Sequence, residues 1–189
     1  MNRTKLILLT SFLFVSTVGI FIACNKNKPS ANKEATSVDA KGLQTVISGV
    51  VGYIDEEENF QEPNHALLVS FFQHIFDIPV EVEFNPYTIH SVPGDPGQPD
   101  ILYVYLRSTD GTVSVTSSLD DLGGGNYLMD GEKSCECKTI DCATTYGCDA
   151  TQTTSGCICS TCEGECEKKS TASSTGYVQN YFITNASSY

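Results

Sequence analysis

Apolar and polar positions along the chain recur with different periods, and each period predicts a type of secondary structure. Between Asn64 and Phe76 the polar side chains lie three and four positions apart, which predicts a mostly apolar helix with one narrow wet stripe. Asn64 is a suitable N-cap, and Pro79 marks a boundary after the helix. The polar stripe consists of Ser70, Gln73, His74 and Asp77.

Alternating or continuous apolar runs predict strands. Residues 80–84 (VEVEF) alternate cleanly, and residues 101–107 (ILYVYLR) are almost entirely apolar and rich in β-forming side chains. Residues 112–118 (TVSVTSS) alternate again after a polar turn, so we expect 101–118 to form a β-hairpin. Residues 177–184 (YVQNYFIT) are expected to return as a last strand.

Other stretches are irregular or ambiguous. Residues 43–54 fit either a helix or strands, because both spacings occur there. Residues 85–100 hold four prolines and two glycines, and residues 119–132 contain three consecutive glycines, so both are expected to be loops. Together the patterns predict an α+β fold, with a small, mostly antiparallel sheet, one or two helices and a disulfide-rich irregular module.

The first 23 residues have the pattern of an export signal. Arg3 and Lys5 precede a run in which 13 of the 18 residues 6–23 are apolar, and the chain turns polar directly after Cys24. The end of this segment, Ile22-Ala23-Cys24, resembles the lipobox of bacterial lipoproteins. An uncleaved membrane-spanning helix is the alternative, since 18 residues is near the lower limit for crossing a bilayer.

The resemblance implies that Cys24 becomes the new N-terminus and carries lipid on its sulfur. Such a protein is anchored through its acyl chains in the bacterial cell envelope. Bacterial lipoproteins without Asp directly after the lipidated cysteine often reach the outer membrane, and this chain has Asn25 there. Residues 24–42 are polar and without periodicity, so we expect a lipidated tether.

The chain is acidic, with 23 Asp and Glu against 11 Lys and Arg and a net charge of −12. Arg107 is the one lysine or arginine between Gly42 and Glu132. This balance argues against a phosphate-neutralising surface, and no nucleic-acid partner is expected. The remaining partners are the membrane, through the lipid anchor, and an unidentified protein or cation attracted by the negative charge.

Eight of the nine cysteines lie within residues 133–170, a segment with few other apolar side chains. Such a segment cannot bury enough surface to order itself, so covalent bridges or a metal must stabilise it. Export favours four disulfides, because thiols at this density pair in an oxidising compartment. The eight residues are Cys135, Cys137, Cys142, Cys148, Cys157, Cys159, Cys162 and Cys166.

Other chemistries of this cluster fit less well. Zinc or an iron–sulfur centre held by two sets of four thiolates is the main alternative. The spacing of Cys159 and Cys162 matches a thioredoxin-type pair, but the surrounding glutamates oppose the low thiol pKa that such a site needs. The stretches 135–139 (CECKT) and 157–161 (CICST) begin two similar half-clusters, which hints at an internal duplication.

No catalytic or metal-binding motif is recognisable, so no catalytic residue is assigned. His65, His74 and His90 are not spaced to bind a metal from one helix face. The expected function is therefore a membrane-anchored envelope lipoprotein with a non-catalytic binding or structural role. A metal-binding lipoprotein and the precursor of a cysteine-rich, antimicrobial-like peptide are the alternatives.

The expected organisation has five parts along the chain. It consists of a signal peptide (1–23), a lipidated tether (24–42), an acidic α+β domain (43–132), a cysteine-rich module (133–170) and a C-terminal strand or tail (171–189).

Overall fold

The computed structural model of the protein describes residues 44–144 and 147–189, which lie in one compact unit, Asp39–Tyr189. The predicted signal peptide, Cys24 and the tether lie outside the described residues. Within the described ranges, no helix is both long and apolar enough to cross a bilayer.

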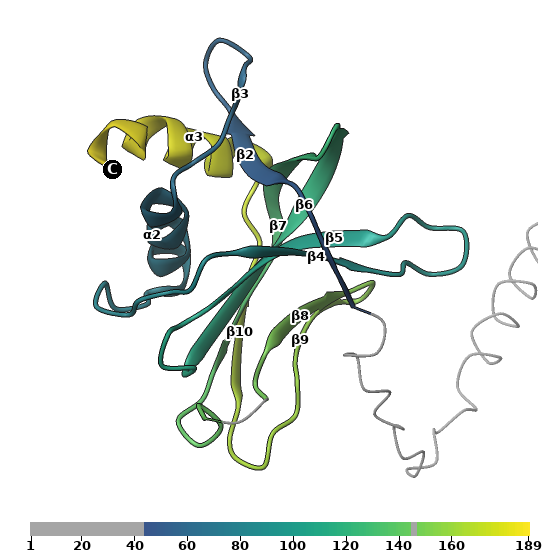
Figure 1. The fold of residues 1–189 in the computed structure, drawn as a ribbon, viewed down its shortest axis with the longest axis vertical. Coiled ribbons are helices and arrows are strands. Elements are labelled where there is room, and N and C mark those ends of the chain that lie inside the picture. Colours follow the sequence, from purple (N-terminus) through teal and green to yellow (C-terminus); the bar gives the residue numbers. More distant parts are fainter. Residues whose placement is uncertain (1–43, 145–146) are drawn as a thin grey trace, which may run out of the picture. The chain divides into compact units, whose positions relative to one another are not determined.

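An eight-stranded, curled sheet dominates the fold (Figure 1), so the sheet is larger than the small one expected from the sequence. Seven strands follow the order β1-β4-β5-β6-β7-β2-β3, and β10 also pairs with β7. All pairs are antiparallel except β2 with β7. The strands are β1 (Thr45–Ile47), β2 (Val50–Ile54), β3 (Phe60–Gln61), β4 (Thr88–Val92), β5 (Ile101–Arg107), β6 (Val113–Gly123), β7 (Asn126–Lys138) and β10 (Glu167–Thr171).

The long strand β7 changes its partner halfway along. Residues 126–128 pair with β2, whereas residues 134–138 pair with β10. Gly131 lies between the two halves with a φ of 71°, a conformation that residues other than glycine rarely adopt. The change of partner lets one hairpin, β6–β7, support two separate edges of the sheet.

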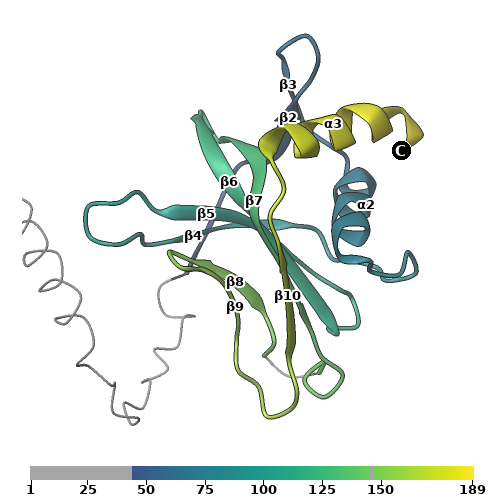
Figure 2. The same ribbon diagram turned by 180° about the vertical axis from the view of Figure 1, so that it is seen from behind.

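Two helices cover one face of the sheet, which we call the helix face (Figure 2). The predicted helix is confirmed as α2 (His65–Phe76), where the Asn64 side chain accepts a hydrogen bond from the Leu67 N–H. It ends earlier than Pro79, because Asp77 adopts a left-handed conformation and donates its N–H to the Gln73 carbonyl. The helix-face core includes Leu68, Phe71, Phe72, Ile89, Val104, Val115, Met129 and Phe182, all at most 1% exposed.

The second helix corrects the expectation of a C-terminal strand over residues 177–184. The segment forms α3 (Thr175–Asn185), followed by a short 3-10 turn, η2 (Ala186–Ser188). Its β-forming residues favoured a strand, but Val178 and Phe182, four positions apart, are both fully buried and lie on one helical face. Ser174 caps the helix by accepting a hydrogen bond from the Tyr177 N–H.

Residues 80–84 are also not the predicted strand. The Val82 N–H donates to the Pro79 carbonyl, and Phe84 forms only an isolated bridge with Ser108. The Gln73 side chain of α2 donates to the carbonyls of Pro79, Val80 and Val82, at 3.2–3.4 Å. These contacts hold the segment in turns against the helix, an effect that the alternation of Val and Glu does not reveal.

Two expected loops are more regular than predicted, and residues 43–54, which fitted either a helix or strands, form strands. Residues 43–54 contain two strands, β1 and β2, and the expected loop 85–100 contains β4. The expected loop 119–132 instead continues the β6–β7 hairpin on both sides of a turn at Gly124 and Gly125. The predicted pairing of residues 101–107 with 112–118 is confirmed as β5 with β6.

Candidate functional site

The eight clustered cysteines form four disulfides: Cys135–Cys157, Cys137–Cys159, Cys142–Cys162 and Cys148–Cys166. Each cysteine of the first half-cluster is therefore bonded to the cysteine of the same rank in the second. This order agrees with the similarity of residues 135–139 and 157–161. The structure thus supplies a connectivity that the sequence leaves open among 105 possibilities.

The disulfides attach a small hairpin to the second face of the sheet, which we call the hairpin face. The hairpin consists of β8 (Ala150–Thr153) and β9 (Gly156–Cys159), which pair only with each other. Cys135 and Cys137, both 0% exposed, project from β7 and bind the two cysteines of β9. The hairpin and the sheet therefore enclose a second, smaller core made largely of disulfide sulfur and Ala150.

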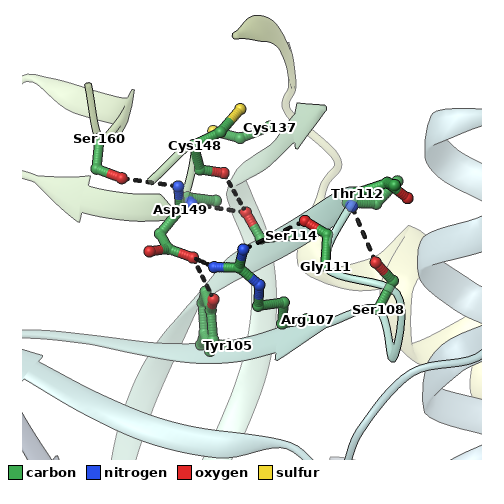
Figure 3. A network of polar contacts seen from close by, with 12 residues as sticks. Tyr105, Arg107, Ser108, Gly111, Thr112, Ser114, Cys137, Cys148, Asp149 and Ser160 are labelled. Carbon is green, nitrogen blue, oxygen red and sulfur yellow. Dashed lines mark hydrogen bonds and ion pairs between the residues drawn. The ribbon is translucent and has the colours of Figure 1, made fainter. Parts of the chain in front are cut away.

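A charged contact positions the start of this hairpin (Figure 3). The Arg107 guanidinium of β5 forms an ion pair with the Asp149 carboxylate, and the Tyr105 hydroxyl donates to the same carboxylate at 2.8 Å. The Asp149 N–H donates to the Ser160 hydroxyl at 2.8 Å. Burial, followed by the negative charge of Asp149, raises the pKa of Tyr105, so this phenol stays a hydrogen-bond donor.

Small polar side chains complete the seam between the sheet and β8. The Ser114 hydroxyl donates to the Cys148 carbonyl at 3.0 Å (Figure 3). It also accepts a hydrogen bond from the Ala150 N–H at 2.8 Å. The amide of Gln152, 0% exposed, donates to the Thr116 hydroxyl and to the Lys133 carbonyl, both at 2.8 Å. These hydrogen bonds hold β8 against the sheet, although the buried Gln152 Oε1 has no hydrogen-bond partner among the described residues.

His90 belongs to an aromatic group on the same face. Its ring stacks on Tyr103 at 5.3 Å and meets the edge of Tyr105 at 5.4 Å. The ring nitrogens contact Gln44 at 2.5 Å and Thr88 at 2.7 Å. Burial lowers the pKa of His90, so the imidazole is neutral at pH 7 and its nitrogens serve this network.

The other two histidines are far less enclosed. His65 is exposed and lies 3.1 Å from the Phe84 carbonyl. His74 is exposed, as its place on the wet stripe predicts, and lies 2.9 Å from the Tyr177 hydroxyl. It borders an open hollow of about 440 Å³ between α2 and the start of α3.

Three carboxylates, Asp120, Asp130 and Glu132, lie near Gly131, where β7 changes its partner strand. Asp130 accepts hydrogen bonds from the Ser118 hydroxyl and from the Glu132 N–H. Partial burial and the charges of Asp130 and Glu132 raise the pKa of Asp120. Within residues 44–144 and 147–189, no group of three or more His, Cys, Asp or Glu side chains is arranged to hold a metal ion.

A cleft of about 380 Å³ lies on the helix face, between the end of α2 and the strands β7 and β10. Glu136 of β7 lines this cleft although the residue is only 8% exposed. Burial raises the pKa of Glu136, whereas the neighbouring Lys169 and Lys138 oppose that shift. The sequence pattern did not indicate this residue, because Glu136 stands between two cysteines in a segment expected to be irregular.

The lysine opposite Glu136 has other partners. Lys169 of β10 is paired in register with Glu136, but its ammonium group donates to the Phe76 carbonyl at 2.7 Å and to the Asp77 carboxylate at 3.2 Å. It thus binds the carboxyl end of α2, where a positive charge is favourable. Among the described residues, none forms a hydrogen bond or an ion pair with the Glu136 side chain.

Comparisons with known proteins give no match: no family model and no curated protein resembles the sequence, and no solved structure resembles the fold.

Proposed function

We propose that the protein is a lipid-anchored protein of the bacterial envelope whose disulfide-bonded domain serves as a non-catalytic binding scaffold. The observation that supports this proposal most directly is the pairing of the cysteines. The four disulfides use every cysteine of the chain except Cys24, the residue of the lipobox-like sequence. Disulfides at this density are typical of exported proteins, and a single remaining cysteine at the polarity switch suits lipidation.

The position of the disulfides favours a scaffold over the precursor of a released peptide. Cys135 and Cys137 lie in β7, which pairs with β6 on one side and with β10 on the other. Excision of residues 133–170 would therefore cut through the middle of the sheet. The same disulfides fix the hairpin face, while the cleft beside Glu136 is a recess on the helix face that could take a ligand.

The test is the intact mass of the full chain isolated from membranes, with thiols alkylated before any reductant is added. We expect a mature chain that begins at Cys24 and carries acyl mass, takes up no alkyl group, and exposes eight thiols after reduction. A Cys24→Ser variant is the matched control, and it should lose the acyl mass while keeping all four disulfides.

Two results would contradict the proposal. A chain that retains residues 1–23 would be held by an uncleaved helix instead of a lipid anchor. Eight alkyl groups that attach only after a chelator is added would show that the thiols hold a metal such as zinc or an iron–sulfur centre.

A further inference from the structure

We propose that the cleft beside Glu136 binds a small organic cation, an amine or a guanidinium carried on an apolar body. The inference deepens the proposed binding role and rests on it. The cleft lies between the end of α2 and the strands β7 and β10, and Glu136 is its most enclosed charged residue.

Glu136 has the properties of a carboxylate whose hydrogen-bond donor is supplied by a ligand. The residue is 8% exposed and lines the cleft, yet no described residue donates a hydrogen bond to it. A carboxylate that is largely enclosed and has no protein partner is costly, and a cationic ligand entering the cleft would supply that partner. An ammonium or guanidinium group also donates the hydrogen bonds that a carboxylate accepts.

Among the charged residues that line the cleft, Glu136 is the enclosed one, and its neighbouring lysines are bonded to other groups or paired in register with other residues. Lys169 is bonded to the Asp77 carboxylate and to the Phe76 carbonyl. Lys138 of β7 is paired in register with Glu167 of β10, which sets one positive charge against one negative charge. The third lysine of the lining, Lys168, donates to the Cys157 carbonyl at 2.9 Å. The lining thus holds three lysines and three carboxylates, and Glu136 is the enclosed carboxylate among them.

The walls of the cleft determine the body of the ligand. Phe76, Ile78, Pro79, Val82 and Val113 line it, so an apolar group would find apolar surface on several sides. A volume of about 380 Å³ lies within the range of small-molecule sites, which span roughly 300–1,000 Å³. A single aromatic ring or a short branched alkyl chain bearing one positive group matches this space and this charge.

The test uses the full chain, purified with its disulfides intact, and three fluorinated probes of one shape. They are 4-fluorobenzylamine, 4-fluorobenzyl alcohol and 4-fluorobenzoate, titrated at pH 7 and followed by the fluorine NMR signal of the probe. We expect the amine to bind at least tenfold more tightly than the alcohol, and the benzoate to show no saturable binding.

Three variants assign the binding to the carboxylate. Glu136→Gln should weaken the amine at least tenfold, whereas Glu57→Gln, which removes the same charge from the exposed β2–β3 turn, should change it less than twofold. Lys138→Gln removes a nearby exposed cation and should tighten the amine two- to fivefold. Because this variant has the opposite expected sign, a damaged fold cannot imitate the result.

Equal affinities of the amine and the alcohol would overturn the inference, as would unchanged amine binding in Glu136→Gln or weaker binding in Lys138→Gln. The membrane-mass experiment reports separately on the anchor and the disulfides. Selective amine binding by a chain that lacks acyl mass would keep the cleft assignment and reject the lipoprotein role. An acylated chain without selective amine binding would keep the lipoprotein role and reject the cleft assignment.

Discussion

Arg107 is the one lysine or arginine between Gly42 and Glu132, and it forms an ion pair with Asp149. Its guanidinium and the Asp149 carboxylate are 21% and 16% exposed at the side chain, so both charges are largely removed from water. The Tyr105 hydroxyl binds the same carboxylate. Loss of one member would therefore leave the others enclosed and incompletely paired.

We expect Asp149→Ala to lower the free energy of unfolding by about 2 kcal/mol, because the variant leaves the Arg107 charge without its carboxylate. Urea denaturation under non-reducing conditions measures this loss. Glu163→Ala is the control, since Glu163 is an exposed carboxylate in the same cysteine-rich segment. Equal stabilities of the two variants would show that the ion pair contributes little.

Glu136 makes stability depend on pH in a direction opposite to that of most carboxylates. Burial raises its pKa in the folded protein above the ordinary value of 4.5. The folded state therefore binds the proton more tightly than the unfolded state does. The resulting stabilisation is present at low pH, below the unfolded value, and is lost as the pH rises through the raised pKa.

We expect Glu136→Gln to be more stable than the wild type at pH 7, and the difference to shrink as the pH falls below the raised pKa. The reason is that the glutamine side chain is uncharged at every pH, so its burial involves no desolvation of a charge. Unfolding free energies of both proteins, measured from pH 4 to pH 8, give this difference directly. A variant that is less stable at pH 7 would mean that the carboxylate has a stabilising partner.

At the scale of elements, Gly131 allows β7 to bend between its two partners. Its φ is 71°, and a Cβ built there would lie 2.4 Å from a methyl carbon of Val178 in α3. Gly97 provides a comparison, because its φ is 87° and a Cβ there meets nothing within 4 Å. The two glycines thus share the backbone requirement and differ in the packing.

We expect Gly97→Ala to cost about 1 kcal/mol of unfolding free energy, the backbone penalty of a left-handed alanine. Gly131→Ala should cost a further 1–3 kcal/mol, because α3 must also move away from the sheet. Thermal or urea unfolding of both variants gives the difference. Similar losses would show that α3 yields to the added methyl group without cost.

The sequence predicted those elements whose pattern is decided locally. The N-cap and the polar stripe identified α2, and the apolar run with its alternating partner identified the β5–β6 pair. The errors came where distant contacts decide. Residues 177–184 are rich in β-forming side chains, but the burial of Val178 and Phe182 against the sheet makes them helical.

In the candidate site, too, local features could be predicted from the sequence and features that depend on distant contacts could not. The cysteine count and the expected export predicted four disulfides, which the structure contains, but the spacing could not give the connectivity. Glu136 went unrecognised because its burial depends on α2, about sixty positions earlier in the chain, and on β10, about thirty positions later. The register that places it opposite Lys169 is a tertiary property.

At the scale of the whole molecule, the disulfides and the sheet depend on the same strand, β7. β7 carries Cys135 and Cys137 and also holds β2, β6 and β10 in place. A boundary between residues 132 and 133 would fall inside this strand. The hairpin face would lose its cover if the bridges to β9 were broken, and the sheet would then expose Tyr103 and Tyr105.

We therefore expect reduction of the four disulfides at pH 7 to unfold residues 44–189 in one step. The closed loops have sequence separations of 18–22 residues, and each bridge of this length contributes about 3 kcal/mol. Even two such contributions are comparable to the roughly 5–15 kcal/mol that stabilises a typical domain. Far-UV circular dichroism, recorded with and without reductant, should lose the strand and helix signals together. The Cys24→Ser variant, which keeps all four bridges, should respond identically. If the helices persisted after eight thiols had become alkylated, the helix-face core alone would be sufficient, and the cysteine-rich segment would be a separate unit appended to it.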